Sequence, residues 1–142
     1  MSSFKDVTPS FAASPQINLD DVAIAAREGF TAIICNRPDG EDNGQLSADK
    51  IAAACAAHGL TFTHIPVSGG MSQMQVELMA SAIEAANGSV LAYCRSGTRS
   101  TNIWALACAA NGDDAESLVQ AAGQAGFDLN GLLPSLRAMG TR

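Results

Sequence analysis

The chain has 142 residues, the length of one ordinary domain, and 47% of them are hydrophobic, which is enough to bury a core. Its formal net charge of −6 argues against nucleic acid as a partner, because binding to phosphate backbones needs a basic face. No apolar run approaches the roughly 18 residues of a membrane span, and residues 1–16 lack the pattern of a secretory signal. We therefore expect one domain over residues 1–142, located in the cytoplasm, with no membrane partner.

Short apolar runs alternate with helical segments along the chain, which is typical of an α/β domain. Strands are predicted at residues 10–13, 31–35, 60–65 and 90–93. Helices are predicted at residues 20–28, 48–58, 72–86, 99–110, 114–122 and 129–139. This order predicts a three-layer α/β fold, with a mostly parallel central sheet of about four or five strands and helices on both faces.

The segment Cys94-Arg95-Ser96-Gly97-Thr98-Arg99-Ser100 lies between a predicted buried strand and a predicted helix. Loop amides and a helix N-terminus at such a place point into one concavity, which suits an anion and stabilises a thiolate. Gly97 permits the tight turn, Arg99 can donate to two oxygens of an oxyanion, and Ser100 can donate to the sulfur. Cys94 and Arg99 are the predicted catalytic residues. The predicted anion-binding residues are Arg95, Ser96, Gly97, Thr98 and Ser100.

Other polar residues follow neighbouring strands, at the sheet edge where α/β proteins bind ligands. Arg37, Asp39 and Ser68 are therefore candidate auxiliary residues, although a structural ion pair or a solvated turn is an equal interpretation of Arg37. Cys35 is interpreted as a buried cysteine, with a second, resolving thiol as the alternative. The four cysteines lack the close-pair spacing of zinc ligands, so neither a metal nor a cofactor is expected.

Residues 29–38 (GFTAIICNRP) and 64–67 (HIPV), together with the order of elements from residue 11 to about 110, resemble the core of dual-specificity protein phosphatases. Within that class the chain resembles the bacterial beta-lactamase hydrolase-like, phosphatase-like domain family, most specifically in residues 92–100 (AYCRSGTRS). Members of that family also occur fused to persulfide dioxygenase-like domains. The resemblance therefore implies a link to sulfide metabolism and a persulfide dioxygenase-like protein as a partner. The Cys94 loop is equally similar to the active-site loop of single-domain rhodaneses.

The chain departs from the phosphatase pattern in three ways. Arg99 gives Cys-x4-Arg instead of Cys-x5-Arg, and Tyr93 replaces the usual histidine before the cysteine. The segment Ser68-Gly69-Gly70 stands where those phosphatases have an aspartic acid. Losing general acid catalysis typically costs ~100- to 10,000-fold in rate. A sulfur donor such as thiosulfate leaves as a stable anion and needs no such proton.

These departures favour a cysteine-dependent sulfurtransferase that carries sulfur as a Cys94 persulfide. Thiosulfate or glutathione persulfide would be the donor, so the expected substrate is a small anion or a persulfide. One alternative is a protein-tyrosine-phosphatase-like phosphomonoester hydrolase that forms a cysteinyl-phosphate. A second alternative is a catalytically weak module that binds an anionic or phosphorylated partner in the same loop.

Overall fold

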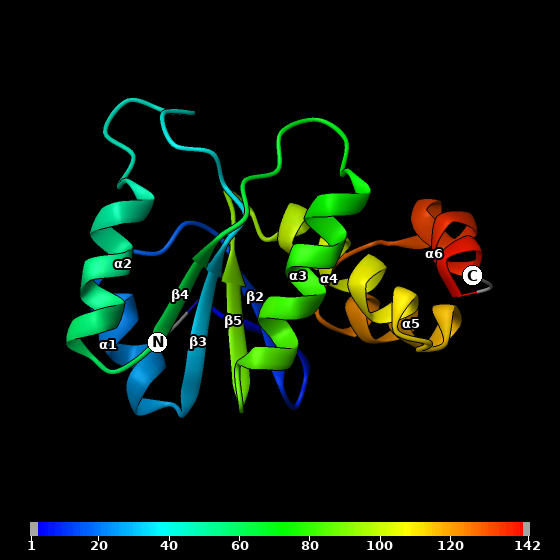
Figure 1. The fold of residues 1–142 in the computed structure, drawn as a ribbon, viewed down its shortest axis with the longest axis horizontal. Coiled ribbons are helices and arrows are strands. Elements are labelled where there is room, and N and C mark those ends of the chain that lie inside the picture. Colours follow the sequence, from blue (N-terminus) through cyan, green and yellow to red (C-terminus); the bar gives the residue numbers. More distant parts are fainter. Residues whose placement is uncertain (1–2, 141–142) are drawn as a thin grey trace.

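A computed structural model of the chain describes residues 3–140 and shows a central sheet with helices on both faces (Figure 1). The five strands lie in the order β1-β2-β5-β3-β4. Their bounds are β1 Lys5–Thr8, β2 Phe11–Ser14, β3 Phe30–Cys35, β4 Thr61–His64 and β5 Ser89–Tyr93. β1 is antiparallel to β2, and the other neighbouring strands are parallel. The predicted three-layer α/β fold with a mostly parallel sheet is therefore confirmed.

The helices divide between the two faces of the sheet, with α1 and α2 on one face and α3 to α6 on the other (Figure 1). Their bounds are α1 Leu19–Arg27, α2 Ala48–Ala57, α3 Gln73–Ala85, α4 Thr98–Ala110, α5 Ala115–Gln124 and α6 Leu133–Gly140, with a short 3₁₀ helix at Asn130–Leu132. Each face has its own core, one that includes Val22 and Ile51 and one that includes Met79 and Trp104. The sheet is thus buried on both sides, as parallel sheets are.

Side-chain caps fix where several helices begin. The Asn18 side chain accepts a hydrogen bond from the Asp21 amide, and the Ser72 side chain accepts one from the Gln75 amide. Such caps satisfy amides that the first helical turn leaves without partners. α4 differs, because its N-cap is Gly97, which has no side-chain oxygen to offer. The loop before α4 provides acceptors instead, because the Gly97 amide donates to Cys94 Sγ and the Thr98 amide donates to the Ser96 hydroxyl.

The strand β1 was not predicted from the sequence. Of its four residues only Val7 is buried, because β1 is an edge strand whose other side chains are exposed or half-buried. A strand with so little apolar patterning gives almost no period-two signal.

The parallel arrangement brings the carboxyl ends of β2, β3, β4 and β5 to one edge of the sheet. The loops after β3, β4 and β5 meet there, at the upper edge in Figure 1. Within residues 3–140, no helix is both long enough and apolar enough to span a membrane.

Candidate active site

The loop from β5 to α4 is organised around the Cys94 sulfur. Cys94 is fully buried directly after β5, and the Gly97 amide donates a hydrogen bond to its Sγ at 3.0 Å. Gly97 has a φ of +96°, a conformation that residues with a side chain rarely adopt. The glycine therefore lets the chain turn back so that a backbone N–H faces the sulfur.

Backbone hydrogen bonds hold this loop against β2 and the first turn of α4. The Cys94 amide donates to the Ser14 carbonyl at 3.3 Å, and the Gln16 amide donates to the Arg95 carbonyl at 3.3 Å. Thr101 donates from its hydroxyl to the Gly97 carbonyl at 2.8 Å. The loop conformation is thus fixed before any substrate arrives, which is the condition for electrostatic preorganisation.

The remaining loop residues form a polar rim and one buried hydroxyl. Ser96 and Thr98 are exposed, and their hydroxyls are 3.2 Å apart. Arg95 is exposed as well, with 68% of its side chain accessible to solvent. Ser100 is fully buried, and its Oγ has no hydrogen-bond partner among the described residues. A buried hydroxyl usually has a partner, so Ser100 remains a candidate donor to a charged sulfur or a bound oxyanion.

Arg99 is held in place by the loop that follows β3. Its Nη1 and Nη2 donate to the two carboxylate oxygens of Glu41 at 2.8 and 2.9 Å, and Nη1 also donates to the Val67 carbonyl at 2.8 Å. A two-point ion pair of this kind fixes the plane of the guanidinium. Hydrogen bonds from Arg99, and then from Arg37, lower the pKa of Glu41 to about 2. Glu41 is therefore ionised at neutral pH and acts as an anchor.

Arg37 also binds Glu41, the carboxylate that holds Arg99. Only 4% of its side chain is exposed, and it donates to Glu41 at 2.9 Å, to Asp42 at 2.7 Å and to the Gln16 side chain at 3.0 Å. Asp42 also lies 3.7 Å from Arg95. The structure therefore places Arg37 in an ion-pair network, which is one of the three interpretations that the sequence left open. Glu41 lies at the centre of this network. From the sequence Glu41 was, with Asp39, a possible substitute acid at this sheet edge, and its pairing with Arg99 was not predicted.

Cys35 lies at the end of β3 and is buried in the core under α1 and α2. Its Sγ donates to the Arg37 carbonyl at 3.3 Å. Burial is the main effect that raises the pKa of this thiol. These surroundings disfavour the thiolate that a resolving cysteine would need.

Comparison with known proteins places this arrangement in a family. Residues 3–111 match the model described as beta-lactamase hydrolase-like protein, phosphatase-like domain. The chain belongs to this family. A beta-lactamase hydrolase-like protein from Xylella fastidiosa is 37% identical over 126 residues, which are 87% of this chain and 29% of that protein. This phosphatase-like domain thus spans less than a third of the length of that relative.

Solved structures agree with the family. A Neisseria meningitidis protein provisionally named a phosphatase is 31% identical, with a TM-score of 0.83 over 98% of this chain and 99% of its own. P. aeruginosa TpbA, solved as a variant in complex with pTyr, shares the fold at 16% identity and a TM-score of 0.65, over 99% of this chain and 91% of its own. The resemblance drawn from the sequence is therefore confirmed.

The structure gives no acid to this phosphatase-like domain at the expected place. Ser68 is exposed after Val67, and Gly69 and Gly70 follow it, so this part of the β4–α3 loop has no carboxylate. Asp39 lies on the neighbouring loop, but its Oδ1 accepts a hydrogen bond from the Ala48 amide at 2.8 Å. That contact makes Asp39 a support for the start of α2. Within residues 3–140, no hydrogen bond or ion pair joins Asp39 or Ser68 to Cys94 or Arg99.

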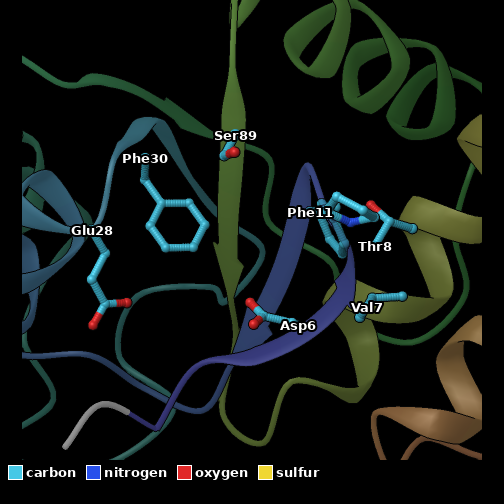
Figure 2. Close-up of a pocket in the computed structure, with 8 residues that line it drawn as sticks. Asp6, Val7, Thr8, Phe11, Glu28, Phe30 and Ser89 are labelled. Atoms are coloured by element: carbon cyan, nitrogen blue, oxygen red, sulfur yellow. The ribbon is translucent and has the colours of Figure 1, made fainter.

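A separate hollow of about 490 Å³ lies at the opposite edge of the sheet, where the parallel strands begin (Figure 2). Figure 2 shows the Asp6 and Glu28 carboxylates and the Phe30 ring on its walls. Because Cys94 follows the other end of β5, this hollow takes no part in chemistry at the sulfur.

Proposed function

We propose that this domain hydrolyses aryl phosphomonoesters through a cysteinyl-phosphate formed on Cys94. The observation that carries the proposal is the Gly97 amide directed at the Cys94 sulfur, 3.0 Å away, at the beginning of α4. Amides and a helix N-terminus stabilise both a thiolate and the oxygens of a phosphoryl group. Arg99 stands beside them with its guanidinium fixed by Glu41.

The relatives support phosphate chemistry better than the sulfur transfer that the sequence favoured. The family model describes a phosphatase-like domain, and the Neisseria meningitidis relative was provisionally named a phosphatase. The P. aeruginosa neighbour was solved with pTyr, an aryl phosphomonoester. This chain has the nucleophile and the arginine that such a substrate requires.

The reaction proceeds in two steps at the sulfur. The Cys94 thiolate attacks phosphorus, an S–P bond forms, and the P–O bond to the aryl group breaks with its electron pair leaving on oxygen. Water then attacks phosphorus, the S–P bond breaks, and inorganic phosphate and the thiolate are released. Arg99 and the loop amides donate to the non-bridging oxygens in both steps. Ser100 can donate to the sulfur when it becomes the leaving group in the second step.

The polar residues near the loop restrict the leaving group. Glu41 has a pKa of about 2 and is ionised, so it cannot supply a proton near neutral pH. Asp39 is engaged with the Ala48 amide. Without a general acid the leaving oxygen departs as an anion, which a phenol tolerates far better than an alcohol does. The substrate class that fits this site is therefore the aryl phosphate.

The test compares turnover of an aryl phosphate and an alkyl phosphate at the same pH, with Cys94→Ser as the blank. We expect aryl hydrolysis to exceed alkyl hydrolysis by at least about 100-fold, the low end of the contribution of general acid catalysis. Rapid quenching followed by intact mass measurement should detect a phosphoryl adduct on Cys94. Equal rates on both esters would overturn the leaving-group argument. Phosphate binding without any turnover would favour the anion-binding module instead.

Sulfur transfer remains the second candidate, and two features of the sequence favour it. The spacing of Cys94 and Arg99 is one residue shorter than in the phosphatases it resembles, and the absent carboxylate is no handicap when thiosulfate is the donor. Its test is intact mass after exposure to thiosulfate or glutathione persulfide. A gain of one sulfur atom that disappears on reduction, with no aryl phosphatase activity, would reverse the order of the two candidates.

A further inference from the structure

The Phe127 ring lies close to Gly97 in the loop that contains Cys94. An ideal β-carbon added at Gly97 would lie 3.0 Å from Phe127 Cζ and 3.1 Å from its Cε1. The same point is 3.5 Å from the carbonyl carbon of Ser14, at the end of β2. The side of Gly97 that a β-carbon would occupy is therefore closed by an aromatic ring and by the backbone at the end of β2.

This enclosure acts on the residue whose amide faces the sulfur. Gly97 has both the left-handed backbone conformation and the N–H that donates to Cys94 Sγ. A glycine can visit many backbone conformations, so something must hold it in the one that directs its amide at the sulfur. Besides the hydrogen bond from Thr101 to the Gly97 carbonyl, the nearby ring limits the space into which the turn could relax.

The position of Phe127 is itself fixed by the end of α5. Its amide donates to the Ala122 carbonyl at 2.9 Å, directly after Gly126, which has a φ of +100°. The half-buried ring also packs on the core shared by α4, α5 and α6. This segment lies beyond residues 3–111, the part that matches the family model. The support for the catalytic loop thus comes from a part of this chain outside the family match.

We propose that Phe127 is a positioning residue, which holds the Gly97 turn so that its amide is directed at the Cys94 sulfur. Phe127 acts through Gly97 and does not touch the reacting atoms. The claim that Phe127 supports catalysis rests on the proposed function. The claim that Phe127 affects the reactivity of the Cys94 thiol does not depend on it. Reactivity of Cys94 can be measured whether the substrate is a phosphate ester or a sulfur donor.

The test measures the rate of Cys94 alkylation by iodoacetate as a function of pH, with the modified peptide identified by mass. Phe127→Ala should slow alkylation near neutral pH by roughly tenfold, the effect of one misplaced hydrogen bond to a charged group. The difference from the natural protein should disappear at high pH, where the thiolate forms without help. The matched control is Leu133→Ala, which removes a half-buried side chain of α6 from the same core.

A second variant covers the case in which Phe127→Ala does not fold. Phe127→Tyr keeps the ring but adds an oxygen to Cζ, the atom that lies against Gly97. It should preserve thermal stability and still reduce Cys94 alkylation and kcat, with a smaller change in KM. If Phe127→Ala and Leu133→Ala lower stability equally and neither changes the alkylation profile, Phe127 only fills space and the proposal is wrong. Normal alkylation and kcat in Phe127→Tyr would overturn it as well.

Discussion

Two loops at the same edge of the sheet build the candidate site, and they do so in different ways. The loop after β5 gathers its groups within seven consecutive residues, from Cys94 to Ser100. The loop after β3 contributes Glu41, which reaches Arg99 across a sequence separation of 58 residues. The first loop supplies the proposed nucleophile and the Gly97 amide that faces it. The second determines how the arginine is presented.

The two loops thus differ in role, since one contains the proposed reacting groups and the other orients them. If the proposed function is right, removing a group of the first loop removes a participant in the reaction. Removing a group of the second loop leaves every participant present but less well oriented, and misorientation costs less than absence. Variants of the two loops should therefore differ in size of effect and in kinetic signature.

The largest effect is expected from Cys94→Ser, because a serine hydroxyl at this place is a far weaker nucleophile than a thiolate. Turnover of any substrate should fall below detection while the fold is unchanged. Activity and circular dichroism on the same preparation test both halves of this expectation. Retention of more than a trace of activity would exclude Cys94 as the nucleophile.

A smaller effect is expected from Glu41→Gln, which replaces the carboxylate that orients Arg99. The ion pair becomes a neutral hydrogen bond, so kcat/KM should fall by about 10- to 100-fold, the cost of ~1.4 to 2.7 kcal/mol of transition-state stabilisation. Steady-state kinetics on an aryl phosphate provide the measurement, and Glu116→Gln, at a surface ion pair with Arg137, is the matched control. Unchanged kinetics would show that Arg99 needs no anchor.

The same contrast explains what the sequence could and could not predict. The Cys94 loop could be predicted from the sequence because its residues are consecutive and lie between a strand and a helix. Each of them also has a chemical reason to be there. The starts of α1 and α3 could be predicted from the local capping residues Asn18 and Ser72. These signals need no knowledge of distant residues.

Contacts between residues that are distant in the sequence could not be predicted from such local patterns. The pairing of Glu41 with Arg99 and the contact of Phe127 with Gly97 depend on how loops from different elements pack together. Arg37 and Asp39 were placed at the correct edge of the sheet, but their partners decide their roles. Arg37 is buried among carboxylates, and Asp39 accepts a hydrogen bond from the Ala48 amide at the start of α2. Charge and loop position alone cannot distinguish these roles from catalysis.

The lowered pKa of Glu41 predicts a specific dependence of stability on pH. A carboxylate with a folded-state pKa of about 2, against an ordinary value of 4.5, contributes stability at every pH above the ordinary value. That contribution is lost as pH falls from there through about 2. The difference in melting temperature between the natural protein and Glu41→Gln should therefore be constant at neutral and mildly acidic pH and shrink only in stronger acid. A difference that already shrinks near neutral pH would contradict the ion pair.

The smallest effect on activity is expected at Asp39, and two substitutions separate its candidate roles. Asp39→Asn keeps the oxygen that accepts from the Ala48 amide but removes the acid, so activity on aryl and alkyl phosphates should stay within about twofold of the natural protein. Asp39→Ala removes the oxygen as well and should lower the free energy of unfolding by about 0.5 to 2 kcal/mol, as the loss of a helix cap does. Denaturant unfolding and steady-state kinetics on both variants provide the measurements. If Asp39→Asn instead abolishes alkyl phosphate hydrolysis that the natural protein performs, Asp39 is the missing general acid. The β3 loop would then contribute chemistry as well as alignment, and the contrast between the two loops would fail.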